Sequence, residues 1–359
     1  MKVVHAKAHG RVNLIGEHTD YNGGFVLPTA IPQFTEVTLT PRADQKVHIR
    51  SAPGKKGQTE RDTSYVLGEE KKNGTWVDYL AGGTHLLLKD GFQLRGFDVQ
   101  ISSSVPEGSG LSSSAALEVA FLKALREAFA LSYSDEELAR LGQRIENEFV
   151  GAHVGIMDQM ACTLARAGEA LFLDTRNMNY EQIKLPLNQM DLLVINSGIS
   201  HRNVGGGYNE RRAQCEEACK ILKISALRDL ETKDLQRLDS LKDVLKRRAR
   251  HVVTENARVL RAVAAIREMN LAELGTLFAE SHASMRDDYE VSLPEIDTLV
   301  SLCSKNKSVF GARLTGGGFG GSIVAITKKG EASTVAAEIL PLYQAQTGES
   351  ASVLVQGDH

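Results

Sequence analysis

The sequence predicts an α+β protein built from two lobes that share one cleft, and three observations support this fold class. The chain has 359 residues, which exceeds the usual size of a single hydrophobic core. Strand-like and helix-like segments alternate without the regular βαβ rhythm of a doubly wound parallel sheet. Apolar residues make up 42% of the chain and charged residues 24%, which is ordinary globular usage and excludes a disordered or fibrous protein.

The first quarter of the chain predicts strands followed by a loop. Alternating apolar and β-branched residues from Phe25 to Arg50, above all in 36–40 and 46–50, predict antiparallel strands. Residues 52–63 show no periodicity and contain Pro and Gly, so we expect a mobile surface loop there.

The rest of the chain predicts helices and strands in mixed order. Ser134 and Glu137 form a capping box that starts one of these helices. Apolar spacing predicts a helix at 76–88, a strand at 96–101, helices at 111–131 and 134–150, strands at 170–173 and 191–195, several helices within 208–282, a glycine loop at 313–321 and strands at 322–326 and 352–355.

Charge and hydropathy exclude several classes of partner. A formal net charge of −3 offers no long-range attraction for nucleic acid or for anionic membranes. No run approaches the ~20 apolar residues that span a bilayer, and residues 1–10 lack the apolar core of a signal peptide. We therefore expect a cytoplasmic protein, and a monomer, since no strong dimer signal is present.

The four cysteines are expected to stay reduced, because four in a chain this long do not make a disulfide framework. Cys215 and Cys219 lie four residues apart in a helical stretch. Packing is favoured over a metal role for them, because no second pair at ligand spacing accompanies them.

A loop of small residues between a predicted strand and a predicted helix is the first candidate site. Glycines let the backbone approach an anion, and a helix N-terminus offers free N–H groups. The composition suits a phosphate cradle, and it equally suits a flexible turn that caps a helix. It is not a Walker loop, because no Lys follows the second glycine. The loop consists of Gly108, Ser109, Gly110, Leu111, Ser112, Ser113 and Ser114.

The segment 10–24 is the second candidate. A short apolar strand leads to Glu17, His18 and Asp20, and Asn22-Gly23-Gly24 turns the chain back. Carboxylates accept hydrogen bonds from vicinal hydroxyls, so the tip suits a polyol, although a charged hairpin facing water has the same composition. Arg11 lies six residues before Glu17 and suits a phosphoryl group or a carboxylate.

The third candidate is Asp158, which lies among apolar residues in the run 151–160. A carboxylate shielded from water could be catalytic, and it could also cap a helix. Glu146, twelve residues earlier, is a surface charge unless the fold brings it near a metal.

Together these segments resemble the three signatures of the GHMP small-molecule kinase superfamily, and residues 10–31 resemble the signature of the galactokinase family. The similarity covers nearly the whole chain, since the runs 108–114, 155–159, 208–212 and 314–321 occur in the family's order. It implies a two-lobed fold with mixed or antiparallel sheets and the active site in the cleft between the lobes. Residues 1–190 would form the ATP- and sugar-binding lobe, and residues 191–359 the C-terminal lobe.

The resemblance also implies an activity, namely transfer of the γ-phosphoryl group of MgATP to the C1 hydroxyl of galactose. The loop 108–114 would wrap the phosphates of ATP, and Ser114 and Glu146 would hold Mg²⁺. Arg11 would stabilise charge on the phosphoryl group, and Asp158 would deprotonate or orient the sugar hydroxyl. The nucleotide pocket would include Ser51, Trp76 and Tyr79, of which Tyr79 could also belong to the core. The implied sugar contacts are Glu17, His18, Thr19, Asp20, Gly155, Asp158 and Tyr208.

Two departures and two alternatives accompany the resemblance. His9 stands where the family usually has Pro, and the chain is somewhat short. A related 1-kinase for N-acetylgalactosamine or arabinose would share the same ligands, because pocket volume decides between these sugars. A non-catalytic galactose and ATP sensor would carry a damaged phosphate loop, whereas Ser112, Ser113 and Ser114 are intact here. The glycine loop 316–321 is expected to support the site, and it is no dinucleotide motif because it precedes a strand.

Overall fold

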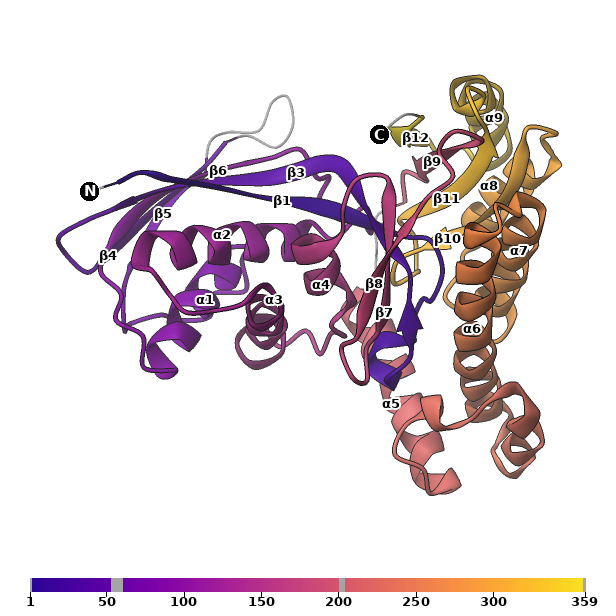
Figure 1. Ribbon diagram of the computed structural model, residues 1–359, viewed down its shortest axis with the longest axis horizontal. Coiled ribbons are helices and arrows are strands. Elements are labelled where there is room, and N and C mark those ends of the chain that lie inside the picture. The colour runs from indigo at the N-terminus through magenta and orange to yellow at the C-terminus, as the bar shows by residue number, and fades with distance from the viewer. Residues whose placement is uncertain (1, 53–60, 200–203, 358–359) are drawn as a thin grey trace. The chain divides into compact units, whose positions relative to one another are not determined.

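The computed structural model describes residues 2–52, 61–199 and 204–357. The chain divides into two compact units. Unit 1 comprises Met1–Arg11, Ile31–Glu107 and Leu111–Leu164, and unit 2 comprises Val12–Ala30, Gly108–Gly110 and Ala165–His359. The colours in Figure 1 follow the chain through both.

This division differs from the expected boundary between residues 190 and 191. Strand β7 (Glu169–Asp174) pairs antiparallel with both β2 (Phe25–Val26) and β8 (Tyr180–Lys184). Helix α6 (Asp243–Arg267) contacts both β2 and β8. Because of these contacts, residues before 190 belong to unit 2. The contacts join segments that are far apart in the sequence, so one boundary along the chain cannot separate the two units.

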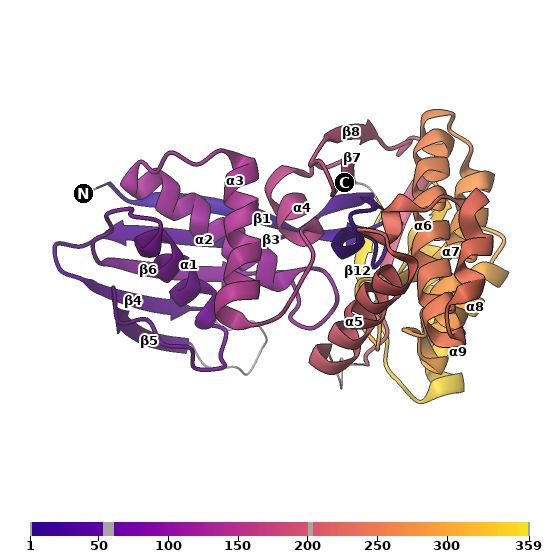
Figure 2. The same ribbon diagram turned by 90° about the horizontal axis from the view of Figure 1, so that it is seen from below.

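Unit 1 contains a twisted sheet with helices on one of its faces (Figures 1 and 2). Its strands are β1 (Val4–Asn13), β3 (Pro28–Pro41), β4 (Lys46–Ser51), β5 (Arg61–Val66) and β6 (Phe97–Ser103). Strand β3 pairs with β1 and, antiparallel, with β6. Strand β4 pairs parallel with β6 and antiparallel with β5. Both β1 and β3 continue beyond unit 1 into residues of unit 2.

Two expectations for this sheet need correction. Strands β3 and β4 do not pair with each other, because β6 lies between them and runs parallel to β4. Residues 61–63 begin strand β5 instead of continuing the loop expected at 52–63. Burial alternates strictly along β5, but its half-buried positions are Arg61, Thr63 and Tyr65, so no apolar periodicity reveals the strand in the sequence. The remaining loop residues, 53–60, lie outside the described residues.

The helices of unit 1 follow the predicted order. Ser134 caps α3 with the predicted capping box, in which the Ser134 hydroxyl accepts from the Glu137 N–H. The helix continues into a π-helical segment, Ile145–Val150, that carries Glu146. Such π-helical turns are frequent at functional sites. The α-helices are α1 (Asp78–Lys89), α2 (Ser113–Phe129), α3 (Asp135–Arg144) and α4 (Met157–Leu164).

Unit 2 contains a second sheet in which all pairs are antiparallel. Its strand order is β10 (Val309–Thr315), β11 (Ser322–Lys328), β9 (Met190–Asn196) and β12 (Ser352–Gln356). Strands β9 and β11 are almost entirely buried, which agrees with their continuous apolar runs.

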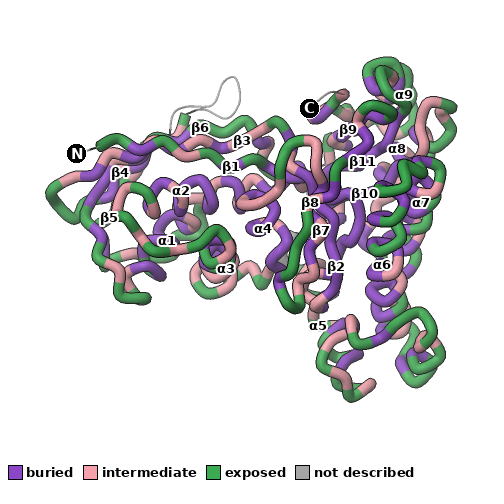
Figure 3. Tube along the Cα trace, in the orientation of Figure 1, coloured by how far each residue is buried: buried purple, intermediate pink, exposed green. Residues whose placement is uncertain are grey.

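Helices α7, α8 and α9 pack on this sheet, and α6, which packs on α7, presents a buried stripe along its length in Figure 3. Helix α7 lies against β10 at very short range, because a Cβ on Gly275 would lie 2.0 Å from the Phe310 carbonyl oxygen. The other helices are α5 (Val204–Leu222), α7 (Leu271–Asp287), α8 (Pro294–Lys305) and α9 (Ala332–Thr347), with 3-10 turns at Asp20–Asn22, Leu227–Asp229 and Thr232–Ser240.

Two further observations concern the whole described chain. Within residues 2–52, 61–199 and 204–357, no helix combines the length and the apolar content needed to cross a bilayer. All four cysteines are free and buried, which agrees with the expectation that they form no disulfide.

Candidate active site

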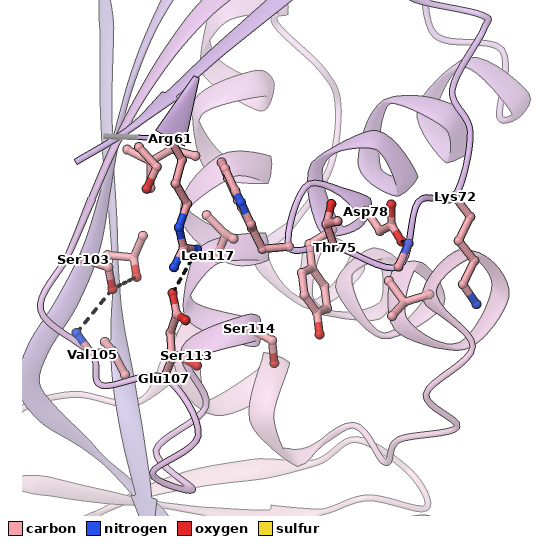
Figure 4. A pocket seen from close by; sticks show the side chains of 17 residues that line it. Arg61, Lys72, Thr75, Asp78, Ser103, Val105, Glu107, Ser113, Ser114 and Leu117 are labelled. Carbon is pink, nitrogen blue, oxygen red and sulfur yellow. Dashed lines mark hydrogen bonds and ion pairs between the residues drawn. The ribbon is translucent and has the colours of Figure 1, made fainter. Parts of the chain in front are cut away.

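A pocket of about 410 Å³ lies in unit 1 where several strands end (Figure 4). Ser51 ends β4, and Arg61, which starts β5, stands opposite it in the strand register. The predicted residues Ser51, Trp76, Tyr79, Ser113 and Ser114 all line the pocket. The structure therefore brings together five of the predicted nucleotide residues from three separate segments.

The pocket also contains residues that the sequence did not single out. Arg61 donates to the Glu107 carboxylate at 3.4 Å, and its guanidinium lies 5.8 Å from the centre of the Trp76 ring. Asp78 accepts from the N–H groups of residues 73 and 74 at 2.9 and 2.8 Å, and so folds the turn that carries Trp76. Figure 4 shows Arg61 and Glu107 on one side of the pocket and Asp78 on the other.

The N-terminus of α2 opens toward this pocket through Ser113 and Ser114. This helix has 17 residues, so its first N–H groups and its dipole favour an anion. Ser112, which precedes the helix, has a left-handed backbone with φ of 60°. Gly108, Ser109 and Gly110 belong to unit 2, and both glycines have positive φ.

Ser114 belongs to a hydrogen-bond network that contains two buried carboxylates, Glu146 and Glu118. The Ser114 hydroxyl donates to the Glu146 carboxylate at 3.2 Å, and the Gln159 amide donates to both Glu146 and Glu118 at 3.2 Å. Burial is the main cause that raises the pKa of Glu146 to about 7, and the negative charge of Asp158 is the second. Burial and the charge of Glu146 raise the pKa of Glu118 well above its usual range.

This arrangement fits a bound divalent cation. A cation would offset the repulsion among these carboxylates, and Ser114 and Glu146 offer the hard oxygen donors that Mg²⁺ prefers. The described residues contain no cluster of three or more His, Cys, Asp or Glu placed to hold a metal. A Mg²⁺ ion that takes most of its ligands from nucleotide phosphates and water needs no such cluster.

Asp158 lies in the first turn of α4, where three hydrogen bonds hold its carboxylate. Arg11 donates through Nε to Oδ1 and through Nη2 to Oδ2, both at 2.9 Å. The Ser112 hydroxyl donates to Oδ2 at 2.6 Å. Arg11 is buried, whereas the Asp158 side chain is 32% exposed. The structure thus brings the predicted residues Arg11 and Asp158 together, and Ser112 joins them.

The tip at 16–24 belongs to unit 2, where Glu17 is almost fully buried. Its carboxylate accepts from the Arg313 guanidinium, from the Gly316 N–H at 3.1 Å and from the Thr315 hydroxyl at 3.3 Å. Burial raises the pKa of Glu17, and the charge of Arg313 acts against that change. Glu17 therefore ties the tip to the glycine loop that follows β10.

The other predicted sugar residues differ in how the protein holds them. The Thr19 hydroxyl lies within hydrogen-bond distance of the carbonyls of Gly16 and Phe25, at 2.8 and 2.6 Å, so it stabilises the loop. His18 is buried, and its ring centre lies 5.5 Å from that of Tyr208 on α5. Asp20 is only half-buried. Direct sugar contacts by Glu17 and Thr19 stay predictions, because both side chains already have protein partners.

Gly155 lies in unit 1 and is buried in the segment just before α4. Arg313, which lies in β10 and pairs with Glu17 of the tip, is a residue that sequence reasoning missed. A signal existed, because an arginine within an otherwise apolar strand has to be paired when it is buried.

Comparison with known proteins places both units in known families. Residues 79–166 match the family described as GHMP kinases N terminal domain, and residues 262–342 match GHMP kinases C terminal. Residues 2–41 match the galactokinase galactose-binding signature.

Individual relatives cover nearly the whole chain. The galactokinase of Chloroflexus aurantiacus is 43% identical over 98% of this chain and 90% of its own length. That of Roseiflexus sp. is 41% identical, over 97% and 90%. The crystal structure of Lactococcus lactis galactokinase complexed with galactose is similar with a TM-score of 0.94 and 35% identity, covering 99% and 94%. A mevalonate kinase structure has a TM-score of 0.68, 19% identity and coverage of 99% and 100%, so it shares the fold.

Proposed function

Because the chain belongs to the galactokinase family of GHMP kinases, we propose that it transfers the γ-phosphoryl group of ATP to the C1 hydroxyl of D-galactose. The observation that carries the proposal is the pairing of Arg11 with Asp158 at the start of α4, with Ser112 as a third member. It joins a fork-shaped cation with a partly exposed carboxylate, and phosphoryl transfer to a hydroxyl uses both.

ATP is proposed to bind in the pocket of unit 1. Trp76 and Tyr79 line one part of the pocket, and Ser113 and Ser114 line another at the start of α2. The aromatic side chains suit a base, and the helix N-terminus suits phosphates. Gly108, Ser109 and Gly110 are proposed to contribute backbone N–H groups to the same phosphates.

Mg²⁺ is proposed to be held by Glu146 and Ser114 together with phosphate oxygens. When bound, it supplies positive charge that neutralises the phosphates of ATP. The protein prepares this position by burying the Glu146 carboxylate and hydrogen-bonding it to Ser114 and Gln159.

Asp158 is proposed to fix the reacting sugar hydroxyl. Both of its oxygens already accept from Arg11, and one also accepts from Ser112. A carboxylate held so firmly is well placed to orient a hydroxyl, and this favours positioning as its main contribution over proton removal. Arg11 is proposed to stabilise the negative charge of the transferring group.

The sugar is proposed to bind at the tip of unit 2 through His18, Asp20 and Tyr208. The ring of Tyr208 packs near those of His18 and Tyr21, so these rings offer a rigid aromatic surface beside the polar Asp20 side chain. Gly155 is proposed to contribute backbone contacts.

A monomer is proposed as the working state, and light scattering coupled to size-exclusion chromatography checks it.

The test is ADP release measured with galactose, glucose, N-acetylgalactosamine and arabinose, each with and without Mg²⁺. We expect Mg²⁺-dependent release with galactose well above that with the other three sugars. Faster release with N-acetylgalactosamine or arabinose would instead assign the related sugar 1-kinase. Galactose binding without any ADP release would assign a sensor.

A further inference from the structure

A chain of hydrogen bonds leads from a buried cysteine to His18. The Cys215 sulfur lies 3.1 Å from the Tyr289 hydroxyl oxygen. The Tyr289 hydroxyl lies 2.8 Å from that of Tyr21, which lies 2.9 Å from Nδ1 of His18. All four residues belong to unit 2, and they come from α5, from the segment after α7 and from the tip.

The packing around this chain holds it in place. The Tyr289 ring contacts two imidazoles, with its centre 4.7 Å from that of His18 and 4.4 Å from that of His251. Arg211 donates from Nε to the Tyr289 carbonyl oxygen at 2.6 Å. Tyr289 is fully buried and Cys215 nearly so. Tyr289 is therefore held in one position, and its hydroxyl hydrogen-bonds to Tyr21 and Cys215.

The protons of this chain stay in place over the ordinary pH range. Burial raises the pKa of Tyr289 and of Tyr21 well above the usual value, so both hydroxyls remain protonated. Burial also raises the pKa of Cys215 to about 11. Burial is the main cause that lowers the pKa of His18 to about 3, and the charge of His251 is the second. The imidazole is therefore neutral.

A neutral imidazole carries one proton, and the chain decides on which nitrogen. A phenol is a good donor and a poor acceptor, whereas an unprotonated imidazole nitrogen is a strong acceptor. The favoured direction is therefore from the Cys215 S–H to Tyr289, from Tyr289 to Tyr21, and from the Tyr21 O–H to Nδ1 of His18. In this direction the His18 proton resides on Nε2.

The Nε2 atom of His18 is buried and has no hydrogen-bond partner among the described residues. The Gly317 backbone partly offsets the pKa change of His18, but its geometry falls short of a hydrogen bond. A buried N–H without a partner is costly unless a ligand supplies an acceptor. Sugar oxygens are such acceptors.

We propose that Cys215, Tyr289 and Tyr21 are positioning residues that hold His18 in the tautomer with the proton on Nε2, where it donates a hydrogen bond to an oxygen of the bound sugar. This inference rests on the proposed function, since it assumes that His18 meets the sugar. Asp20 offers a carboxylate acceptor at the same tip, so a fixed donor at His18 adds the ability to distinguish the sugar's oxygens. The hydrogen-bond chain thereby acts on sugar affinity and not on nucleotide affinity.

The direct test is nitrogen NMR of the histidine rings in the whole protein, which shows which ring nitrogen carries the proton. The His18 signal is assigned as the one that disappears in His18→Gln. We expect protonated Nε2 in the wild-type protein and a shift toward the other tautomer in Tyr21→Phe, which removes the donor to Nδ1. A proton on Nδ1 in the wild type, or an unchanged tautomer in Tyr21→Phe, overturns the proposal.

Galactose titrations of the same proteins give the functional readout. Tyr289→Phe and Tyr21→Phe each remove one hydroxyl and are expected to raise the KM for galactose about ten-fold, with the KM for ATP unchanged. The double variant is expected to be no worse than either single one, because both break the same chain. Additive losses would mean that the two hydroxyls act separately and would overturn the proposal.

The cysteine end has a matched control one helical turn away. Cys215→Ala is expected to weaken galactose binding, and Cys215→Ser, which retains a donor, to restore most of it. Cys219→Ala removes a buried thiol of the same core that is no member of the chain, and it is expected to leave the KM for galactose unchanged. Equal effects of Cys215→Ala and Cys219→Ala contradict the proposal. If the wild type does not bind galactose at all, the proposed function fails instead.

Discussion

Replacing Arg313 by Met tests whether the ion pair with Glu17 holds the tip of unit 2 in its fold. Arg313 is completely buried, and its guanidinium donates to the Glu17 carboxylate and, at 2.9 Å, to the Leu14 carbonyl. Glu255 lies 3.7 Å from the same guanidinium. The substitution therefore leaves two buried carboxylates without a shared cation and one carbonyl without its donor.

The expected cost follows from these contacts. Removing one partner of a buried ion pair costs about 3–5 kcal/mol of unfolding free energy. Glu255 retains Arg258 at 2.7 Å, and Glu17 can take up a proton because burial already raises its pKa. Both effects limit the loss, so we expect a value near the lower end, about 3 kcal/mol.

Urea unfolding followed by circular dichroism measures this loss. The matched control is Arg261→Met, which breaks an exposed pair with Glu273 at 2.7 Å and is expected to cost no more than about 1 kcal/mol. Adding Glu17→Gln to Arg313→Met removes the uncompensated charge and should recover part of the stability. Equal losses for Arg313→Met and Arg261→Met, or no recovery in the double variant, would refute the reasoning.

Three further predictions concern other parts of the molecule. Burial lowers the pKa of His251 from 6.5 to about 4, so the unfolded chain binds more protons between these values, and unfolding free energy should fall as pH drops from about 6.5 to 4. His251→Gln should reduce that fall by up to about 3 kcal/mol in urea titrations, whereas the exposed His5→Gln should not. Trp76→Ala should raise the KM for ATP about ten-fold and leave that for galactose unchanged, while Trp76→Phe retains most of the affinity. Glu146→Gln should raise the Mg²⁺ concentration for half-maximal ADP release about ten-fold or more, with nucleotide binding in the absence of Mg²⁺ unchanged.

Each of these three has an outcome that counts against it. A His251→Gln protein with the same pH dependence as wild type would mean that His251 is not the buried group responsible. An unchanged KM for ATP in Trp76→Ala would place the base elsewhere. An unchanged Mg²⁺ requirement in Glu146→Gln would remove Glu146 as a metal ligand.

Local signals in the sequence were sufficient for much of the fold. The capping box at Ser134 marks the start of α3, and the run of small residues 108–114 leads into α2, whose first residue is Ser113. These features depend on a few neighbouring residues, so a single sequence contains them. The resemblance to a kinase family then related the separate segments to one another.

Features that depend on distant pairing were beyond the sequence. Nothing local shows that β6 lies between β3 and β4, and the pocket residue Arg61 was missed because the strand it begins was taken for a loop. Arg313 and Glu17 are 296 residues apart along the chain, so only the fold shows that each is the partner of the other. Tyr289 lies in a charged run that offers no sign of a buried hydroxyl.

A single-turnover measurement of phosphoryl transfer from labelled ATP to galactose tests the role of Asp158 and hence the proposed reaction. Fluorescence of Trp76, the only tryptophan in the chain, measures ATP binding in the same proteins. Wild-type protein should form galactose 1-phosphate, and Asp158→Ala should bind ATP normally while transferring phosphate at least about a hundred times more slowly. Transfer by Asp158→Ala at more than about a tenth of the wild-type rate would contradict the account.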